Sequence, residues 1–379
     1  MEKYDVIVIG GGIAGASAAY ELAAGRKVVV LERESQPGYH ATGRSAALFH
    51  DTYGKGAVVK LTRASRGFYE KPPAGFAEVP LLTPRGVLIF GRADQRAKLV
   101  ASQRESEKAG VSAILVTPEQ AVALVPVLRP DYIAVAVHEP AVMDLDAHAI
   151  HQGFLKGLRQ RGGRVVTDAD VTALKRSGAD WVVDSSAGSF TAPVVVNAAG
   201  AWGDEIARLA AVRPVGLSPK RRTAFMVATD HDARLWPAAI DADEAFYIKP
   251  DAGQLLAAPA NEDAMPPHDV QAEEMDIAIA IDRIETATTL QVRKIGRKWA
   301  GLRSFVGDRV MVAGYDDAAP GFFWLVGQGG YGFQTGPALA RATAALVAGK
   351  DLPDDMKALG LTAQDLLPSR AGLTRSFAY

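Results

Sequence analysis

The first 32 residues contain the pattern that most constrains the fold of this chain. An apolar run, 6–9, is followed by Gly10, Gly12 and Gly15, an alanine-rich stretch, and a second apolar run that ends at Glu32. The run is typical of a strand buried on both faces, and glycines at this spacing allow a tight turn, a close pyrophosphate and close packing of a helix on a strand. The N–H groups that open the helix attract phosphate, and a carboxylate at the end of the second strand can accept a hydrogen bond from a ribose hydroxyl. The pattern therefore predicts a Rossmann-like α/β unit that binds an adenine dinucleotide.

Composition excludes several other classes of function. The 379 residues carry a formal net charge of −1 and no cysteine. A balanced charge provides no electrostatic footprint for nucleic acid. The absence of cysteine removes disulfides, thiolate metal sites and a cysteine nucleophile, and the scattered histidines indicate no metal site. No apolar run approaches the roughly 18 residues that span a bilayer. We therefore expect a cytoplasmic protein without a transmembrane segment, either free or peripheral to the inner membrane.

Dinucleotide-type segments recur along the chain. Residues 193–203 and 321–335 also read as a buried strand that enters a turn of small residues, whereas 214–260 has a strand-rich pattern. Residues 37–47 read as a loop that leads into a helix, and 273–290 as a helix. We expect a discontinuous cofactor lobe made of 1–47, 143–212 and 308–379. The second lobe, 48–142 and 213–307, would bind the substrate.

Six segments together resemble the D-amino-acid oxidase/glycine oxidase superfamily of FAD enzymes, and within it the bacterial D-arginine dehydrogenases. They are 31–34, 36–40, 42–47, 219–222, 299–305 and 328–332. The resemblance covers essentially the whole chain. It implies an FAD lobe and a substrate lobe with a mixed, largely antiparallel sheet. Without cysteine the FAD cannot be cysteinyl-linked. We expect non-covalent FAD, although a histidine link stays open.

The fingerprint and the resemblance together predict the FAD-binding residues. We expect contacts from Gly10, Gly12, Ile13, Ala14, Gly15, Glu32, Arg33, Thr42, Gly43, Arg44, Ser45, Ala46, Val171, Ala199, Gly200, Trp202, Gly329, Gly330, Tyr331, Gly332, Gln334 and Thr335.

The resemblance also implies how a substrate carboxylate is held. The residues at matching positions are Tyr53, Arg222, Tyr247 and Arg303. Arginine suits this role because its planar fork binds both oxygens of a carboxylate. Without the resemblance, the arginines would read as an exposed charge run and a structural ion pair, and the tyrosines as packing residues. We expect Gly330 to pass close to flavin and substrate, and His50 is a further candidate for the site.

One departure from the D-arginine dehydrogenases changes the expected substrate. Those enzymes have a glutamate in the strand after Arg85 that pairs with the substrate guanidinium, and this chain has Val87 there. Leu48, Ala238 and Ile240 stand at other positions that border the substrate side chain. Removing one partner of a buried ion pair costs about 3–5 kcal/mol. We therefore predict a preference for neutral or apolar side chains over arginine.

The leading interpretation is FAD-dependent oxidative deamination of D-amino acids. The Cα hydride would pass to the flavin, and the imino acid would hydrolyse to a 2-oxo acid and ammonia. Alternatives within the superfamily are oxidation of secondary or cyclic amino acids (glycine-, sarcosine- or proline-like) or of a 2-hydroxy acid. An NAD-dependent dehydrogenase and a non-enzymatic flavoprotein are more distant alternatives. The sequence leaves open the natural substrate, the oligomeric state and the electron acceptor, which could be oxygen, a quinone or an artificial acceptor.

Overall fold

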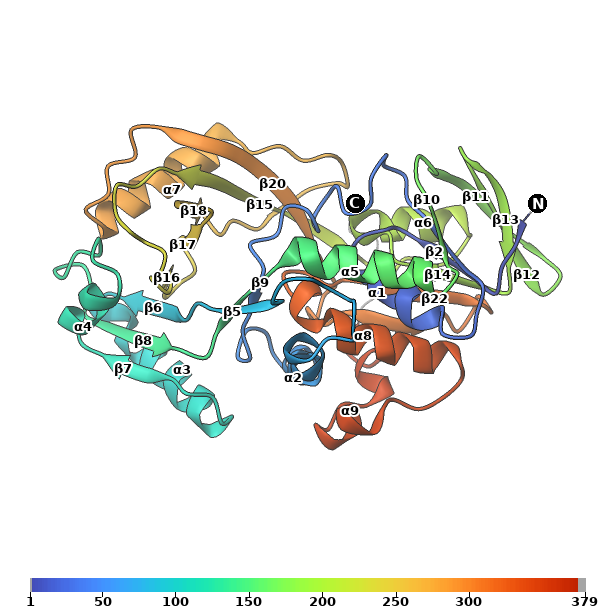
Figure 1. Cartoon of the computed structure of the whole chain (residues 1–379), viewed down its shortest axis with the longest axis horizontal. Coiled ribbons are helices and arrows are strands. Elements are labelled where there is room, and N and C mark those ends of the chain that lie inside the picture. Colours follow the sequence, from blue (N-terminus) through green and yellow to red (C-terminus); the bar gives the residue numbers. More distant parts are fainter. Residues whose placement is uncertain (1, 374–379) are drawn as a thin grey trace.

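The computed structural model describes residues 2–373, and its two largest sheets lie next to each other along the long axis of the molecule (Figure 1). The first is a six-stranded sheet with the order β10-β3-β2-β14-β22-β21. Its strands are β10 (Arg164–Val166), β3 (Val28–Leu31), β2 (Val6–Ile9), β14 (Val194–Asn197), β22 (Phe322–Val326) and β21 (Val312–Tyr315). All neighbours are parallel except β21, which runs antiparallel to β22.

Both faces of this sheet are covered, as the continuous apolar runs predict. Alternate residues of β2 enter different cores: Val6 and Val8 pack with helices, while Ile7 and Ile9 pack against a second sheet. The helices are α1 (Ile13–Leu22), α5 (Ala147–Gln160) and α8 (Gly332–Val347). The second sheet contains β1 (Glu2–Lys3), β13 (Gly188–Ala192), β12 (Asp180–Ser185) and β11 (Val171–Ser177), and α6 (Gly203–Leu209) lies on the same face.

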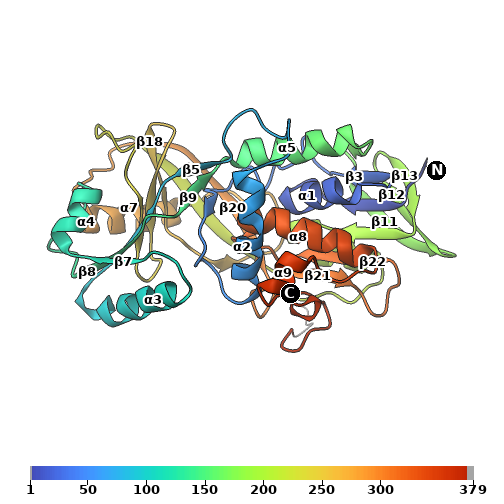
Figure 2. The ribbon, with the colours of Figure 1, turned by 60° about the horizontal axis from the view of Figure 1, so that its bottom comes forward.

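The other large sheet has nine strands and is mostly antiparallel, with β16 and β6 as the parallel pair. Its strands are β19 (Asp263–Ala264), β15 (Ser218–Val227), β20 (Ile295–Phe305), β18 (Gln254–Ala258), β17 (Tyr247–Asp251), β16 (Ala238–Asp241), β6 (Val87–Gly91), β8 (Val135–Glu139) and β7 (Ile114–Val116). One face packs on α7 (Glu274–Ala287) and α4 (Pro118–Leu124). Helix α3 (Arg96–Lys108) covers the end near β7 and β8 (Figure 2).

A small three-stranded sheet joins the two regions. It contains β4 (Leu48–Phe49), β9 (Met143–Leu145) and β5 (Leu82–Pro84). The sequence predicted that the loop at 37–47 leads into a helix, and this is wrong: Leu48 and Phe49 pair with β9, and α2 (Ala57–Glu70) begins only after a further turn. The reason is that Phe49 is fully buried against Tyr69 of α2, which an extended segment allows. The remaining elements are α9 (Asp354–Ala358) and 3-10 turns at Ala93–Gln95, Gly200–Trp202 and Ala363–Asp365.

Each large sheet draws its strands from separate stretches of chain. The six-stranded sheet uses strands between 6 and 31, between 164 and 197, and between 312 and 326, whereas the nine-stranded sheet uses strands between 87 and 139 and between 218 and 305. The predicted discontinuous α/β architecture with a mixed, largely antiparallel second sheet is therefore confirmed. The exact lobe boundaries given above stay a prediction.

Candidate active site

A cavity of about 370 Å³ lies between the carboxyl ends of the parallel strands and the nine-stranded sheet. This is where ligands bind in open α/β sheets. Most of the residues predicted to bind the cofactor line it. They are Gly10, Gly12, Ile13, Ala14, Glu32, Arg33, Thr42, Arg44, Ser45, Ala46, Val171, Ala199, Gly200, Trp202, Gly329, Gly330 and Gly332. Segments far apart in the sequence therefore meet around one space.

The glycine turn between β2 and α1 has no room for side chains. A Cβ on Gly10 would lie 2.5 Å from the carbonyl oxygen of Ala198, and one on Gly15 would lie 1.9 Å from the carbonyl oxygen of Gly10. Gly10 also has a φ of +101°, which L side chains rarely adopt. At the start of α1 the N–H of Ile13 donates to the Thr42 hydroxyl at 3.0 Å. The turn thus exposes backbone to the cavity at a helix N-terminus, as a pyrophosphate requires.

Glu32, at the end of the second strand of the fingerprint, also lines the cavity. Its carboxylate accepts hydrogen bonds from the backbone N–H groups of Gly11 (2.8 Å) and Glu34 (2.9 Å). Burial raises the pKa of Glu32, and these two N–H groups oppose the rise. The backbone of the glycine turn therefore orients this carboxylate toward the predicted ribose position.

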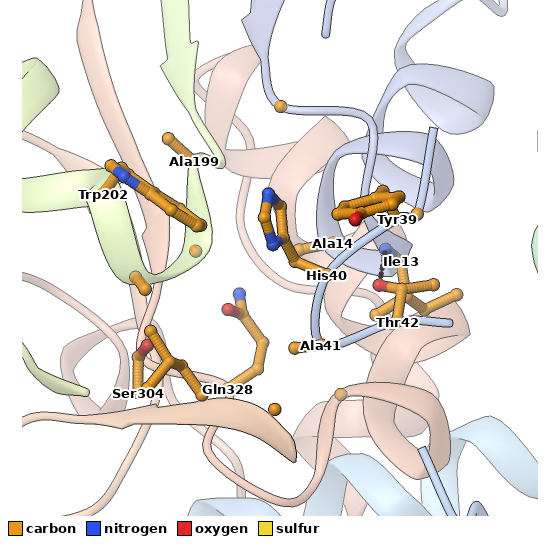
Figure 3. Close-up of a pocket in the computed structure, with 18 of the residues that line it drawn as sticks. Ile13, Ala14, Tyr39, His40, Ala41, Thr42, Ala199, Trp202, Ser304 and Gln328 are labelled. Carbon is orange, nitrogen blue, oxygen red and sulfur yellow. Dashed lines mark hydrogen bonds between the residues drawn. The ribbon is translucent and has the colours of Figure 1, made fainter. Parts of the chain in front are cut away.

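Aromatic rings and one unpaired amide face the middle of the cavity. The rings of His40 and Trp202 lie 4.6 Å apart between centroids, and Gln328 projects from below them (Figure 3). The Nε2 of Gln328 is buried and has no hydrogen-bond partner within residues 2–373. A buried donor without a partner fits a ligand that brings acceptor atoms, as the flavin and phosphates of FAD would. Sequence reasoning missed Gln328, although it begins the glycine-rich turn at 328–332.

The two predicted arginines reach the cavity from paired strands. Arg222 of β15 stands opposite Gly301 of β20, and Arg303 follows two residues later. Side chains alternate along a strand, so Arg303 and Gly301 share a face with Arg222. All three residues line the cavity. A Cβ on Gly301 would contact the Arg44 side chain at 3.5 Å and the Ala41 backbone at 3.8 Å, so the glycine opposite Arg222 faces the loop at 37–47.

The arginines have little counter-charge. Arg222 donates to the carbonyl of Asn261 and contacts Glu262 at 3.4 Å, while Arg303 forms no ion pair with any residue from 2 to 373. Burial lowers the pKa of Arg222, and the nearby Arg303 lowers it further. Burial also lowers the pKa of Arg303, but its interactions with Tyr53, Tyr247 and Glu262 together outweigh burial and leave that pKa raised. Because a guanidinium is protonated throughout the physiological pH range, both side chains are cationic, which attracts an anion to this end of the cavity.

Three further predicted residues meet at Arg303. Its Nη1 donates to the Tyr53 hydroxyl at 3.4 Å. A Cβ on Gly330 would lie 3.1 Å from that nitrogen and 3.3 Å from that hydroxyl. Tyr247 lines the cavity next to them. The carboxylate-binding group predicted from the sequence is thus brought together in space.

Five predicted cofactor residues do not line the cavity and have structural contacts instead. Gly15 packs α1 on β2, and Gly43 donates its N–H to the carbonyl of Gly38. Tyr331 packs edge-on against Tyr53. The Gln334 amide donates to the Tyr53 carbonyl and the Thr62 hydroxyl, and Thr335 donates to the Tyr331 carbonyl.

The four residues predicted to form the substrate side-chain pocket lie outside this cavity. Val87 and Ala238 are fully buried in a cluster with Val142, and Leu48 and Ile240 pack on it with partial exposure. Because Ile240 pairs with Tyr247 across the sheet, the cluster still begins beside one of the residues predicted to hold the substrate carboxylate. Leu48 and Ile240 are thus its exposed edge, while Val87 and Ala238 support them from behind.

The structure adds a carboxylate that the sequence analysis did not consider. Val87 stands where the resembled enzymes have a glutamate, and Glu139 of β8 is its direct partner across the sheet and shares its face. The carboxylate of Glu139 contacts His50 (2.8 Å), Thr52 (2.9 Å) and Ser106 (3.2 Å). His50, predicted as a further candidate for the site, is therefore bonded to Glu139 and does not line the cavity. Sequence reasoning missed Glu139 because the pairing of β6 with β8 cannot be seen in the sequence.

The fold and this cavity define an FAD-dependent oxidoreductase. The family model described as "FAD dependent oxidoreductase" matches residues 5–346, and the chain belongs to this family. The bound cofactor of the family is FAD, in agreement with the sequence prediction.

Curated relatives are distant. Human mitochondrial dimethylglycine dehydrogenase is 26% identical over 268 residues, which cover 68% of this chain and 30% of the relative. One component of the anaerobic glycerol-3-phosphate dehydrogenase of Escherichia coli K12 is 31% identical over 222 residues, covering 56% of this chain and 40% of the relative. The chain thus spans less than half the length of these relatives. The HcnC component of the hydrogen cyanide synthase of Pseudomonas aeruginosa is 25% identical and covers 91% of both chains.

Solved structures share the fold. The L-proline dehydrogenase of P. horikoshii has a TM-score of 0.81 at 23% identity and covers 93% of this chain and 96% of its own. The glycine oxidase of Geobacillus kaustophilus has a TM-score of 0.80 at 20% identity, with coverage of 92% and 96%. Within residues 2–373, no helix has the length and apolar character to cross a membrane. In the same range no cluster of acidic or histidine side chains is arranged to hold a metal ion.

Proposed function

We propose that this protein is an FAD-dependent dehydrogenase or oxidase of D-amino acids that prefers neutral or apolar side chains. The observation that carries the proposal is the pair of cavity-facing guanidiniums, Arg222 and Arg303, of which Arg303 has no ion-pair partner within residues 2–373. A substrate carboxylate would supply the missing negative charge and accept forked hydrogen bonds. The family and the shared fold support the redox class, and the D configuration rests on resemblance.

Each group at this end of the cavity has a distinct task in the proposed reaction. Bound FAD supplies the hydride acceptor. Arg222 and Arg303 bind the carboxylate, and the hydroxyls of Tyr53 and Tyr247 orient it from the side. Gly330 leaves the space that the substrate Cα needs beside them, since a side chain there would contact both Arg303 and Tyr53. Holding the substrate in a fixed orientation next to the cofactor lowers the entropic part of the activation barrier.

The charges around the proposed side-chain compartment argue against a cationic substrate. Glu139 is close, but His50, Thr52 and Ser106 already contact its carboxylate. Lys249 follows Tyr247 by two residues on the same face and is buried against Asp144, which also pairs with Arg85. These charges add to the two cavity arginines, so a guanidinium side chain would enter a region that is already rich in positive charge.

A substrate panel tests the proposal. We expect D-Leu, D-Met or D-Phe to bleach the bound flavin under anaerobic conditions with a higher kcat/KM than D-Arg or D-Lys. Each buried methylene contributes about 0.8 kcal/mol, so activity should rise along a short aliphatic series until the compartment is full. L-amino acids, sarcosine, L-proline and D-lactate serve as comparisons. A tenfold advantage for D-Arg would overturn the side-chain preference, and faster bleaching by a secondary amine or a hydroxy acid would overturn the substrate class.

A further inference from the structure

We propose that Glu139 is a positioning residue for Tyr53, acting through the turn His50–Asp51–Thr52–Tyr53. Glu139 is 1% exposed and lies at the end of β8, 89 positions from His50 in the sequence. It does not line the cavity. The inference deepens the proposed function, because it assigns a role at the proposed carboxylate-binding group.

Glu139 is bonded to two of the four residues in the turn. Its Oε2 lies 2.8 Å from the His50 Nε2 and accepts from the Thr52 hydroxyl at 2.9 Å. The same hydroxyl lies 2.9 Å from the His50 Nε2, so the three groups form a closed triangle. Ser106 of α3 approaches the other carboxylate oxygen at 3.2 Å. Although burial opposes ionisation, these partners keep the pKa of Glu139 below its ordinary value. Glu139 is thus a charged, fully engaged anchor inside the protein.

The anchored turn presents Tyr53 to Arg303. The N–H of Tyr53 donates to the carbonyl of His50 at 3.1 Å, which closes the turn. The rings of His50 and Tyr53 are nearly parallel, with an interplanar angle of 10° and centroids 6.0 Å apart. The Tyr53 hydroxyl then lies 3.4 Å from the Arg303 Nη1. Glu139 therefore fixes His50, and His50 fixes both the backbone and the ring of Tyr53.

Other contacts hold the turn but do not replace this one. Asp51 is paired with Arg66 of α2, and Gln334 of α8 donates to the Tyr53 carbonyl at 3.0 Å. Both belong to the side of the turn that faces the helices, whereas Glu139 approaches from the sheet. Without the Glu139 carboxylate, the turn at 50–53 would lose its hydrogen bonds to β8. The Tyr53 hydroxyl would then occupy a wider range of positions around Arg303.

A double-mutant cycle with a carboxylate probe tests the inference. Acetate has a carboxylate but no amine or oxidisable substrate Cα, so its binding to the FAD-loaded protein, followed by the flavin absorbance change, is independent of turnover. We expect Glu139→Gln, which keeps the shape and removes the charge, to weaken acetate binding about three- to tenfold. Tyr53→Phe removes only the hydroxyl. In the Tyr53→Phe background, Glu139→Gln should have no further effect.

Controls separate positioning from a general structural effect. Asp241→Asn changes a buried carboxylate of the same sheet that lies on the other face. Asp241 shares its face of β16 with Ala239, which packs in the core beneath α7 and α4, so this variant should leave acetate affinity unchanged. Thr52→Val removes two of the three contacts in the triangle, those of the Thr52 hydroxyl with His50 and with Glu139, and should act in the same direction as Glu139→Gln. It also serves as the second variant if Glu139→Gln does not fold. Equal loss with and without the Tyr53 hydroxyl, or no loss at all, would overturn the inference.

A crystal structure of Glu139→Gln gives a readout that needs no ligand. Displacement of Tyr53 away from hydrogen-bond distance of Arg303 supports the inference, and an unchanged Tyr53 contradicts it. This measurement also distinguishes the two proposals. If acetate does not perturb the flavin of the unmodified protein, the carboxylate-binding role in the proposed function fails, while the position of Tyr53 still decides the role of Glu139.

Discussion

At the scale of single residues, the site is organised by charges that the protein leaves partly uncompensated. Within residues 2–373, Arg303 donates to the Tyr53 hydroxyl and forms no ion pair, and Arg222 has one peripheral carboxylate, Glu262, at 3.4 Å. Glu139, by contrast, has three side-chain partners. The positive end of the cavity is therefore available to an anionic ligand, whereas the buried negative charge is not available to a cationic one.

Removing either guanidinium should weaken substrate use while FAD stays bound. For Arg222→Met and Arg303→Met we expect kcat/KM for the best amino acid to fall roughly 30- to 5000-fold. This corresponds to about 2–5 kcal/mol of lost binding free energy in the transition state, because a charge-assisted contact in a closed site is lost. Steady-state kinetics and the flavin content of the purified variants measure this. Arg234→Met, whose side chain is 80% exposed, is the matched control and should behave as the unmodified protein. Near-normal kinetics in both test variants would show that the arginines are structural.

Glu262 makes stability depend on pH. Hydrogen bonds from Arg309, and then from Lys220, lower its pKa from 4.5 to about 2. Because the folded pKa is depressed, its contribution to stability is fully present above about pH 4.5 and is lost as the pH falls toward about 2. We expect Glu262→Gln to lower the urea midpoint at pH 7, and the difference from the unmodified protein to shrink between pH 4.5 and 2.5. A difference that is constant over this range would contradict the expectation.

At the scale of elements, the β2–α1 turn and the β15–β20 pair determine the site. Within the turn Gly15 packs directly on the Gly10 carbonyl, a contact between residues close in the sequence, so its glycine spacing was readable. In the strand pair, β20 has eleven residues and β15 has ten. Their antiparallel register puts Arg222 opposite Gly301 and Arg303 opposite Lys220. No local pattern specifies that register. The sequence reading recognised the segment at 299–305 by resemblance and did not predict it as a strand.

Two alanine substitutions in helices should have opposite effects. Gly15→Ala would put a methyl group 1.9 Å from the Gly10 carbonyl oxygen, so we expect loss of FAD and a lower melting temperature. Gly67 lies in α2 with no atom within 4 Å of a Cβ, and Gly67→Ala should stabilise the protein by about 0.5–1 kcal/mol. Thermal melting and flavin content of both variants test this. Retention of FAD by Gly15→Ala would mean that the turn can open without loss of the site.

At the scale of the whole molecule, Arg44 connects the loop at 37–47, which lines the cavity, to the region of the nine-stranded sheet. Its guanidinium donates to the carbonyls of Val270 (3.0 Å) and Ala300 (2.8 Å) and pairs with Asp269, while Trp299 donates to its carbonyl at 3.1 Å. Arg44 was predicted as a cofactor residue. It does line the cavity, and its bonds also hold two distant parts of the chain together around that cavity.

Loss of this connection should accelerate release of FAD. For Arg44→Met we expect a several-fold faster dissociation of FAD, because the cavity walls lose three guanidinium contacts, and more rapid hydrogen exchange at 268–271. Arg234→Met is again the control. Flavin fluorescence after dilution measures the release. An unchanged rate together with unchanged exchange would show that the loop is held mainly by its backbone and by Trp299.

The sequence by itself determined the parts of this protein whose residues are neighbours along the chain. The strand, glycine turn, helix and acid at 6–32 specify a dinucleotide-binding unit because they form one continuous stretch of chain, in which even Gly11 and Glu32 are only 21 positions apart. The resemblance to the family added the arginines and tyrosines that are predicted to hold a substrate carboxylate. The tertiary structure alone decided how Glu139 meets His50 and Thr52, why the Gln328 Nε2 in the cavity has no hydrogen-bond partner among residues 2–373, and why Val87 lies behind Leu48 and Ile240. These features depend on strand register and on the path of loops between distant segments. Packing of the whole chain sets both, and no local pattern records them.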